Sequence, residues 1–229
     1  MIALIRFQLA GYLRSMRFLP SLIVTLLLVM LVFSQWPTGP DPVKLATGTY
    51  GDAAAFMVPL SAWTTRSLLD TQPTVQRWLS LLAVRRSALA GLFAAFIASS
   101  ALSLLLFAAP FLQALTVGVP AQTTVAAVLL AALASAAGSF IGAWTSRAII
   151  PGSGTSLLVL LSALTATLLL GLGRLSFLGI PYLDWIKAAH DGPSKLQAAL
   201  PSVLLHLVLW CGVVATGYLV TLHRRGTPT

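Results

Sequence analysis

The chain has 229 residues, of which 58% are hydrophobic and only 8% are charged. Soluble globular domains carry about 25% charged residues, so this composition excludes an ordinary soluble enzyme and indicates an integral membrane protein. The net charge of +9 would favour nucleic acid in a soluble chain, but its distribution along this sequence matters more than its total, and we predict no nucleic-acid partner. At about 20 apolar residues per span, the length allows about six helices in a single membrane domain over residues 1–229.

Residues 1–17 hold too many charges to cross a membrane. On a helical wheel one face is apolar and another is basic. The apolar positions are Ile2, Ile5, Leu9, Leu13 and Met16, and the basic positions are Arg6, Arg14 and Arg17. This pattern predicts an amphipathic helix lying at the inner membrane surface. A signal peptide with residues 22–33 as its apolar core is the alternative, but it lacks a small-x-small cleavage site.

The first span is predicted at residues 18–36, and a polar outer loop follows whose prolines and glycines argue against regular structure. The second span, residues 51–69, contains Pro59, which removes a backbone hydrogen bond, and the sequence leaves open whether the helix breaks there. Short, proline-interrupted spans often face a protein interior or a pathway. The alternative is an ordinary bundle helix whose Arg66 extends to the interface.

A polar and basic segment, residues 69–91, interrupts the apolar sequence. Its sequence is LDTQPTVQRWLSLLAVRRSALAG, and Arg77, Arg85 and Arg86 fall within about three helical turns. We predict that it forms the inner elbow between the second and third spans, where a soluble partner would dock.

Four further spans complete the predicted fold, at residues 88–112, 123–144, 155–172 and 201–222. In the fourth span, Ala134, Gly138 and Gly142 repeat at intervals of four, a small-residue ridge that lets another helix approach closely, within the chain or in a dimer. Between the fifth and sixth spans, residues 182–191 (YLDWIKAAHD) have one apolar and one charged face. This segment predicts an amphipathic or re-entrant helix on the outer surface.

The positions of lysine and arginine predict the orientation, because short inner loops hold most of these residues. With both termini inside, the inner side receives Arg6, Arg14, Arg17, Arg66, Arg77, Arg85, Arg86, Arg147, Arg224 and Arg225. The outer side receives only Lys44, Arg174, Lys187 and Lys195. We therefore predict an all-α, multi-pass protein of the cell membrane with six spans and both termini cytoplasmic.

Motifs for catalysis and metal binding are missing from the sequence. It has no G-x-x-x-x-G-K-[ST] phosphate loop and no H-E-x-x-H, and its histidines, His190, His206 and His223, are dispersed. No glutamate occurs, and no acid lies near the middle of a predicted span, which disfavours a carrier driven by protons or sodium. We predict that the chain is not an enzyme and itself binds no metal or cofactor.

The order of these elements resembles the permease subunit of type-2 ABC exporters. The resemblance implies that the elbow contains a coupling helix that docks on a separate ATPase subunit, which would bind ATP and Mg. It assigns docking to residues 73–86, with Pro73, Arg77, Trp78, Arg85 and Arg86 as the contacts. The alternative is a basic loop held against anionic lipid headgroups.

The same resemblance implies a second permease subunit, in a homodimer or heterodimer surrounded by membrane lipid. It also implies an export pathway for an amphipathic or lipophilic substrate, lined by the second and fifth spans. The predicted lining residues are Phe56, Trp63, Ser162 and Thr165. The alternative function is a non-transporting scaffold or immunity-type protein that binds a lipid or a partner helix through the small residues of the fourth span.

Overall fold

The computed structural model describes residues 1–72, 87–173 and 175–226. Within these ranges the chain forms helices and no β-strand. The elements are α1 (Ile2–Arg14), α2 (Leu19–Leu31), α3 (Pro42–Leu69), α5 (Ser87–Val117), α6 (Ala121–Trp144), α7 (Ser153–Gly171), the 3-10 helix η1 (Ser176–Leu178), α8 (Tyr182–His190) and α9 (Pro193–Gly226).

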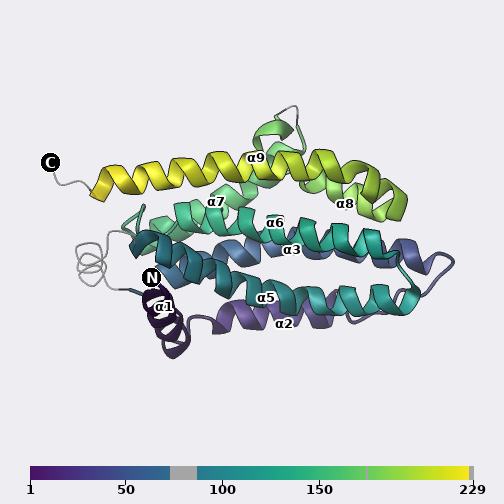
Figure 1. The fold of residues 1–229 in the computed structure, drawn as a ribbon, viewed down its shortest axis with the longest axis horizontal. Helices are drawn as coiled ribbons and strands as arrows, with labels where there is room; N and C mark the ends of the chain where they lie inside the picture. Colours follow the sequence, from purple (N-terminus) through teal and green to yellow (C-terminus); the bar gives the residue numbers. More distant parts are fainter. Residues whose placement is uncertain (73–86, 174, 227–229) are drawn as a thin grey trace.

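The helices form an elongated bundle in which α2, α3, α5, α6 and α9 run along the long axis, while α1 lies across one end (Figure 1). The C-terminal end of α9 lies at the same end as α1, and α8 lies at the opposite end. Helices α3 and α6 pack against each other and contribute residues to both large apolar clusters of the interior. They are therefore the centre of the fold.

Four helical segments in the described residues are long and apolar enough to cross a membrane: Leu89–Val117, Ala121–Trp144, Ser153–Gly171 and Pro193–Leu222. Helices α1 and α2 pass the same test only as a pair, and they meet at 74°. These helices suit an all-α, multi-pass membrane protein. The number of spans, predicted as six, stays a prediction.

Helix α3 begins at Pro42, so the loop predicted over residues 37–52 is wrong from Pro42 onward. The side chain of Asp41 caps the helix by accepting a hydrogen bond from the backbone N–H of Lys44 at 3.0 Å. Pro42 occupies the first helical position, where a missing N–H has no cost. The helix also continues through Pro59 to Leu69 without a break, which answers the question that the sequence left open.

The small-residue ridge of α6, formed by Ala134, Gly138 and Gly142, packs on α3. A Cβ added at Gly138 would overlap the backbone of Val58, and one at Gly142 would overlap the backbone of Ala62. The two helices are thus in direct backbone contact, and only glycine fits at these two positions of α6.

Helix α8 is fixed to the N-terminal part of α3 through two glycines. A Cβ at Gly51 would lie 2.6 Å from the Cβ of Ala189, and one at Gly48 would lie 2.8 Å from Nδ1 of His190. A hydrogen bond between His190 Nε2 and Asp52 Oδ1, at 3.0 Å, also joins α8 to α3 at this place. The glycines that suggested a loop in the sequence therefore make room for α8.

The apolar face of α8 is buried, as its pattern predicted. Tyr182, Trp185 and Ala189 are buried, whereas Asp184 and Lys187 are exposed. Burial raises the pKa of the Tyr182 hydroxyl above its ordinary value, so this hydroxyl stays neutral at physiological pH.

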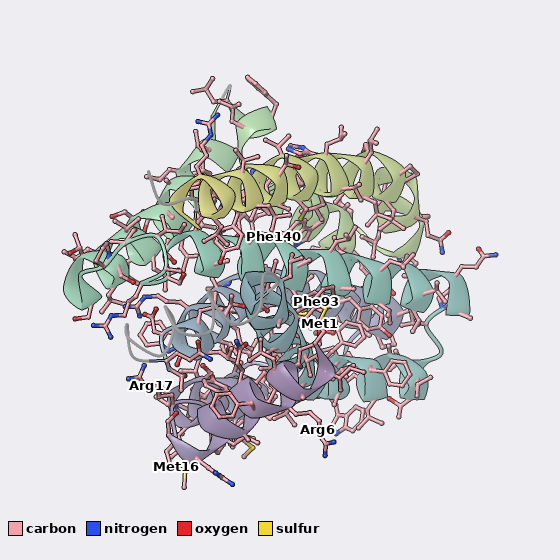
Figure 2. All side chains as sticks on the ribbon, turned by 60° about the vertical axis from the view of Figure 1, so that its left-hand side comes forward. Met1, Arg6, Met16, Arg17, Phe93 and Phe140 are labelled. Carbon is pink, nitrogen blue, oxygen red and sulfur yellow. The ribbon has the colours of Figure 1, made fainter. Side chains whose placement is uncertain are left out.

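Helix α1 is amphipathic, but its buried face differs in part from the predicted one. Ile5, Leu9 and Tyr12 pack against α3 and α5, whereas Leu13 and Met16 are exposed. Ile2 is exposed as well. Figure 2 shows Arg6 and Met16 pointing away from the other helices. Met16 lies beyond the end of α1 at Arg14, so the predicted helical face does not reach it. Contact of the exposed Ile2 and Leu13 with a membrane surface stays a prediction.

Candidate functional site: the basic end of the bundle

The described charged residues belong to segments at or near the two ends of the bundle. On α1, in the corner after it and near the C-terminal ends of α3, α6 and α9 are Arg6, Arg14, Arg17, Arg66, Asp70, Arg147 and Arg224. At the N-terminal part of α3, on α8 and at the start of α9 are Asp41, Lys44, Asp52, Asp184, Lys187, Asp191 and Lys195. Helix α1 and the C-terminal end of α9 lie at one end of the bundle, and α8 lies at the other (Figure 1). We name the first group's end the basic end, because among the described residues it carries arginines and a single acid.

Asp70 links three segments at the basic end. It caps the C-terminus of α3 and is 5% exposed. Its Oδ1 accepts a hydrogen bond from the backbone N–H of Arg147 at 2.7 Å, and its backbone oxygen accepts one from Nη1 of Arg17 at 2.7 Å. The corner between α1 and α2, the end of α3 and the turn between α6 and α7 therefore meet at this residue.

Arg66 connects α3 to the start of α7. Its Nε donates to Ser156 Oγ at 2.7 Å, and its Nη2 donates to the backbone oxygen of Ser153 at 3.0 Å. The carboxylate of Asp70 lies farther away, with Oδ2 at 3.8 Å from Nη2. The side chain of Arg66 is only 13% exposed, so this guanidinium is held in the protein and does not extend freely to the interface.

A cavity of about 270 Å³ lies among these groups. It is lined by Arg17, Pro20, Trp63, Arg66, Ser67, Asp70, Arg147 and Ser153. The lining contains three arginines and one aspartate, so it carries an excess of positive charge. Pockets for drug-sized molecules measure about 300–1,000 Å³, so this cavity suits a small anionic group better than a whole amphipathic substrate.

The residues predicted to line a pathway do not share one cavity in the described structure. Phe56 packs edge to face on Phe33, with ring centroids 6.4 Å apart. Trp63, which is 37% exposed, lines the basic cavity. Ser162 and Thr165 lie on the exposed surface of α7.

The predicted contacts with an ATPase, Pro73, Arg77, Trp78, Arg85 and Arg86, lie outside the described residues. The Asp70 network is located just before this segment in the chain. The structure therefore describes the residues that directly precede the segment in the chain.

A buried hydroxyl cluster, which the sequence reading missed, connects α3, α5 and α6. Ser135 Oγ lies 2.8 Å from Ser61 Oγ and 3.1 Å from Ser103 Oγ. One turn away, Thr65 Oγ1 lies 3.1 Å from Ser99 Oγ. The signal in the sequence is a pair of hydroxyl residues four positions apart on both α3 and α5, which places both members on one helical face.

Replacing Ser135 by alanine is expected to destabilise the bundle by about 1 kcal/mol, because it leaves Ser61 and Ser103 without their shared partner. The thermal unfolding midpoint of the purified protein measures this effect. Ser202→Ala is the matched control, because the exposed Ser202 hydroxyl bonds only the backbone of its own helix. Equal midpoints for the two variants would show that the cluster adds nothing to stability.

A second, wider cleft of about 550 Å³ lies between α8 and α9 at the opposite end. Asp184, Asp191, Lys187 and Lys195 line it, together with His206, so its acidic and basic groups balance. In the parts of the chain that the structure covers, no group of three His, Cys, Asp or Glu side chains is arranged to hold a metal.

No family model matches the chain, and neither a curated protein nor a solved structure matches it. The class of protein that the described helices support is an all-α, multi-pass membrane protein.

Proposed function

We propose that the chain is the transmembrane permease subunit of an ABC exporter, driven by a separate ATPase subunit that binds ATP and Mg. The observation that supports this function is the Asp70 network, which lies directly before the proposed docking segment, residues 73–86. Through this network α3 is bonded to Arg17 and to the backbone of Arg147. A displacement of the docking segment by an ATPase would therefore be transmitted to α2, α3 and α7 together.

The proposed topology has α2, α3, α5, α6, α7 and α9 as six crossings, with both termini in the cytoplasm of a cell. The gathering of arginines at the basic end supports this orientation. Helix α2 has 13 residues and a length of about 20 Å, shorter than a hydrocarbon core of about 30 Å. The first crossing in this proposal therefore includes residues beyond both ends of α2, or a locally thinner bilayer.

A second permease subunit is proposed to cover α7. Only 17% of the most apolar window of α7 is buried in the described structure, against 61% for α6. Ser162 and Thr165 are exposed on this helix, and hydroxyls on an apolar helix favour contact with another helix. An amphipathic or lipophilic substrate would pass between α3 and α7 of the two subunits.

The alternative function, a non-transporting scaffold, relies on the small-residue ridge of α6 as its binding surface. Gly138 and Gly142 are covered by the backbone of α3 in this chain. The small-residue ridge that motivated the scaffold hypothesis is therefore already used for packing within the chain. Nothing in the described structure favours a scaffold over a permease.

The proposal predicts that an ATPase co-purifies with the tagged protein from its native membrane in mild detergent. Reversing the charge of two docking arginines, Arg85→Glu/Arg86→Glu, is expected to reduce the recovered ATP hydrolysis about tenfold or more, because like charges repel across an interface and desolvated charge pairs are lost. The recovered proteins are identified by mass spectrometry and assayed for ATP hydrolysis.

The matched control is Arg6→Glu/Arg14→Glu, which reverses two exposed arginines of α1 at the same end of the bundle. This control is expected to retain the ATPase. Absence of any ATPase with the wild-type protein would overturn the proposed function, and equal recovery with both double variants would remove residues 85 and 86 from the docking site.

A further inference from the structure

We propose that the cavity at the basic end binds the phosphate of an anionic glycerophospholipid, whose acyl chains lie along α2. This inference does not depend on an ATPase partner. It rests on the charge of the cavity, on the groups that are available to a ligand, and on the apolar surface that begins at its edge.

The lining of the cavity is chemically suited to a phosphate group. Arg17, Arg66 and Arg147 surround the cavity, and Asp70 is its only acid. Arginine is always charged, and its planar group matches phosphate oxygens with paired N–H donors. A phosphodiester with one negative charge is therefore complementary to the excess charge of this lining. Basic pockets between membrane helices are typical sites for anionic headgroups.

Two arginine side chains of the lining have N–H donors that are available to a ligand. In the described part of the chain, Arg147 uses its backbone N–H to bind Asp70, and its exposed guanidinium makes no hydrogen bond or ion pair. Arg17, also exposed, donates to the neutral backbone oxygen of Asp70 and forms no ion pair within the described residues. Both side chains can therefore turn toward a phosphate without breaking a salt bridge.

The surface next to the cavity is apolar, and this favours a lipid over free phosphate as the ligand. Pro20 lines the cavity, and Ile23, Leu27 and Met30 continue along the same face of α2 with exposures of 53%, 52% and 67%. From Pro20 to Met30 the helix rises about 15 Å, or half of a hydrocarbon core of about 30 Å. This apolar stripe has about the length of one leaflet, and α2 runs away from the end where α1 lies (Figure 1).

Trp63 contributes an aromatic side chain to the lining of the charged cavity. It is 37% exposed. Tryptophan is enriched at the level of lipid headgroups, where one part of the ring contacts hydrocarbon and another contacts water. Its position is the one expected beside a bound headgroup, close to the glycerol backbone of the lipid.

The test uses the full-length protein, purified and delipidated in a neutral detergent, and measures its thermal unfolding midpoint during titration with lipid. Phosphatidylglycerol is expected to raise the midpoint, because a ligand that binds the folded state stabilises it. Phosphatidylcholine with the same acyl chains, whose headgroup has no net charge, and inorganic phosphate at the same concentration are expected to have much smaller effects. Native mass spectrometry counts the bound lipid.

Arg147→Gln is expected to weaken phosphatidylglycerol binding about tenfold, because one charge-assisted contact is lost. Arg147→Lys restores the charge and is expected to recover part of the affinity. Arg14→Gln is the matched control, since Arg14 is exposed at the same end but does not line the cavity. Equal binding by the Arg147→Gln and Arg14→Gln variants would overturn the proposal. Equal stabilisation by inorganic phosphate would also overturn it, in favour of a site for free phosphate.

Discussion

Replacing Gly142 by alanine is expected to lower the thermal unfolding midpoint by on the order of 10 °C, through an overpacking cost of about 3 kcal/mol. The added Cβ would overlap the carbonyl oxygen of Ala62 and lie 3.0 Å from its Cα. The obstacle is backbone rather than a flexible side chain, so α6 and α3 would have to separate. The midpoint of the purified protein, with its monodispersity in detergent, measures the change.

Gly212→Ala is the control for this substitution. Gly212 lies in α9, and a Cβ at this position would meet nothing within 4 Å. Alanine has a higher helix propensity than glycine by up to about 1 kcal/mol, so this variant is expected to be equally stable or slightly more stable. A midpoint for Gly142→Ala as high as that for Gly212→Ala would contradict direct backbone contact between α3 and α6.

The sequence predicted the elements whose signal is local. Apolar length indicated the helices that became α5, α6, α7 and α9, and charge periodicity indicated α8. The start of α3 was missed because Gly48 and Gly51 resemble loop residues unless the helix that packs on them is known. Pro42 was a starting signal for a helix that the glycines after it obscured.

Helix α3 differs from the other long helices in a way that only tertiary structure explains. It has 28 residues, yet it is not among the segments that are apolar enough to cross a membrane by themselves. Its hydroxyl residues Ser61 and Thr65 are buried against α5 and α6, so they do not face the surroundings of the bundle. A polar residue is acceptable in such a helix when neighbouring helices supply its hydrogen bonds.

The candidate site was harder to predict from the sequence than the helices were, because its contacts join residues far apart in the chain. Arg17 and Asp70 are separated by 53 positions, and Asp70 and Arg147 by 77. The sequence indicated that these arginines share one side of the protein, but a charge count contains no pairing information. Of the residues predicted to line a pathway, Trp63 lies at the basic cavity, while Ser162 and Thr165 lie on the exposed surface of α7.

Replacing Asp70 by alanine is expected to destabilise the protein by about 3 kcal/mol, because it removes a buried carboxylate that accepts from the backbone N–H of Arg147 and lies beside the guanidinium of Arg66. Asp70→Asn tests charge separately from hydrogen bonding, since its side-chain oxygen can still accept from the N–H of Arg147. We therefore expect the order of stability to be wild type, then Asp70→Asn, then Asp70→Ala. Thermal unfolding gives the order, and hydrogen exchange of the backbone amides shows where the structure opens.

The control is Asp184→Ala, which removes an exposed acid at the opposite end and is expected to change stability by no more than about 0.5 kcal/mol. In the Asp70 variants, faster exchange is expected at Arg147, whose N–H loses its acceptor in Asp70→Ala, and at the corner between α1 and α2. Exchange that rises only within α3 would mean that Asp70 caps its own helix without joining the three segments. Faster exchange in all three segments would show that α3 is mechanically connected to α2 and α7, which a permease driven from residues 73–86 requires.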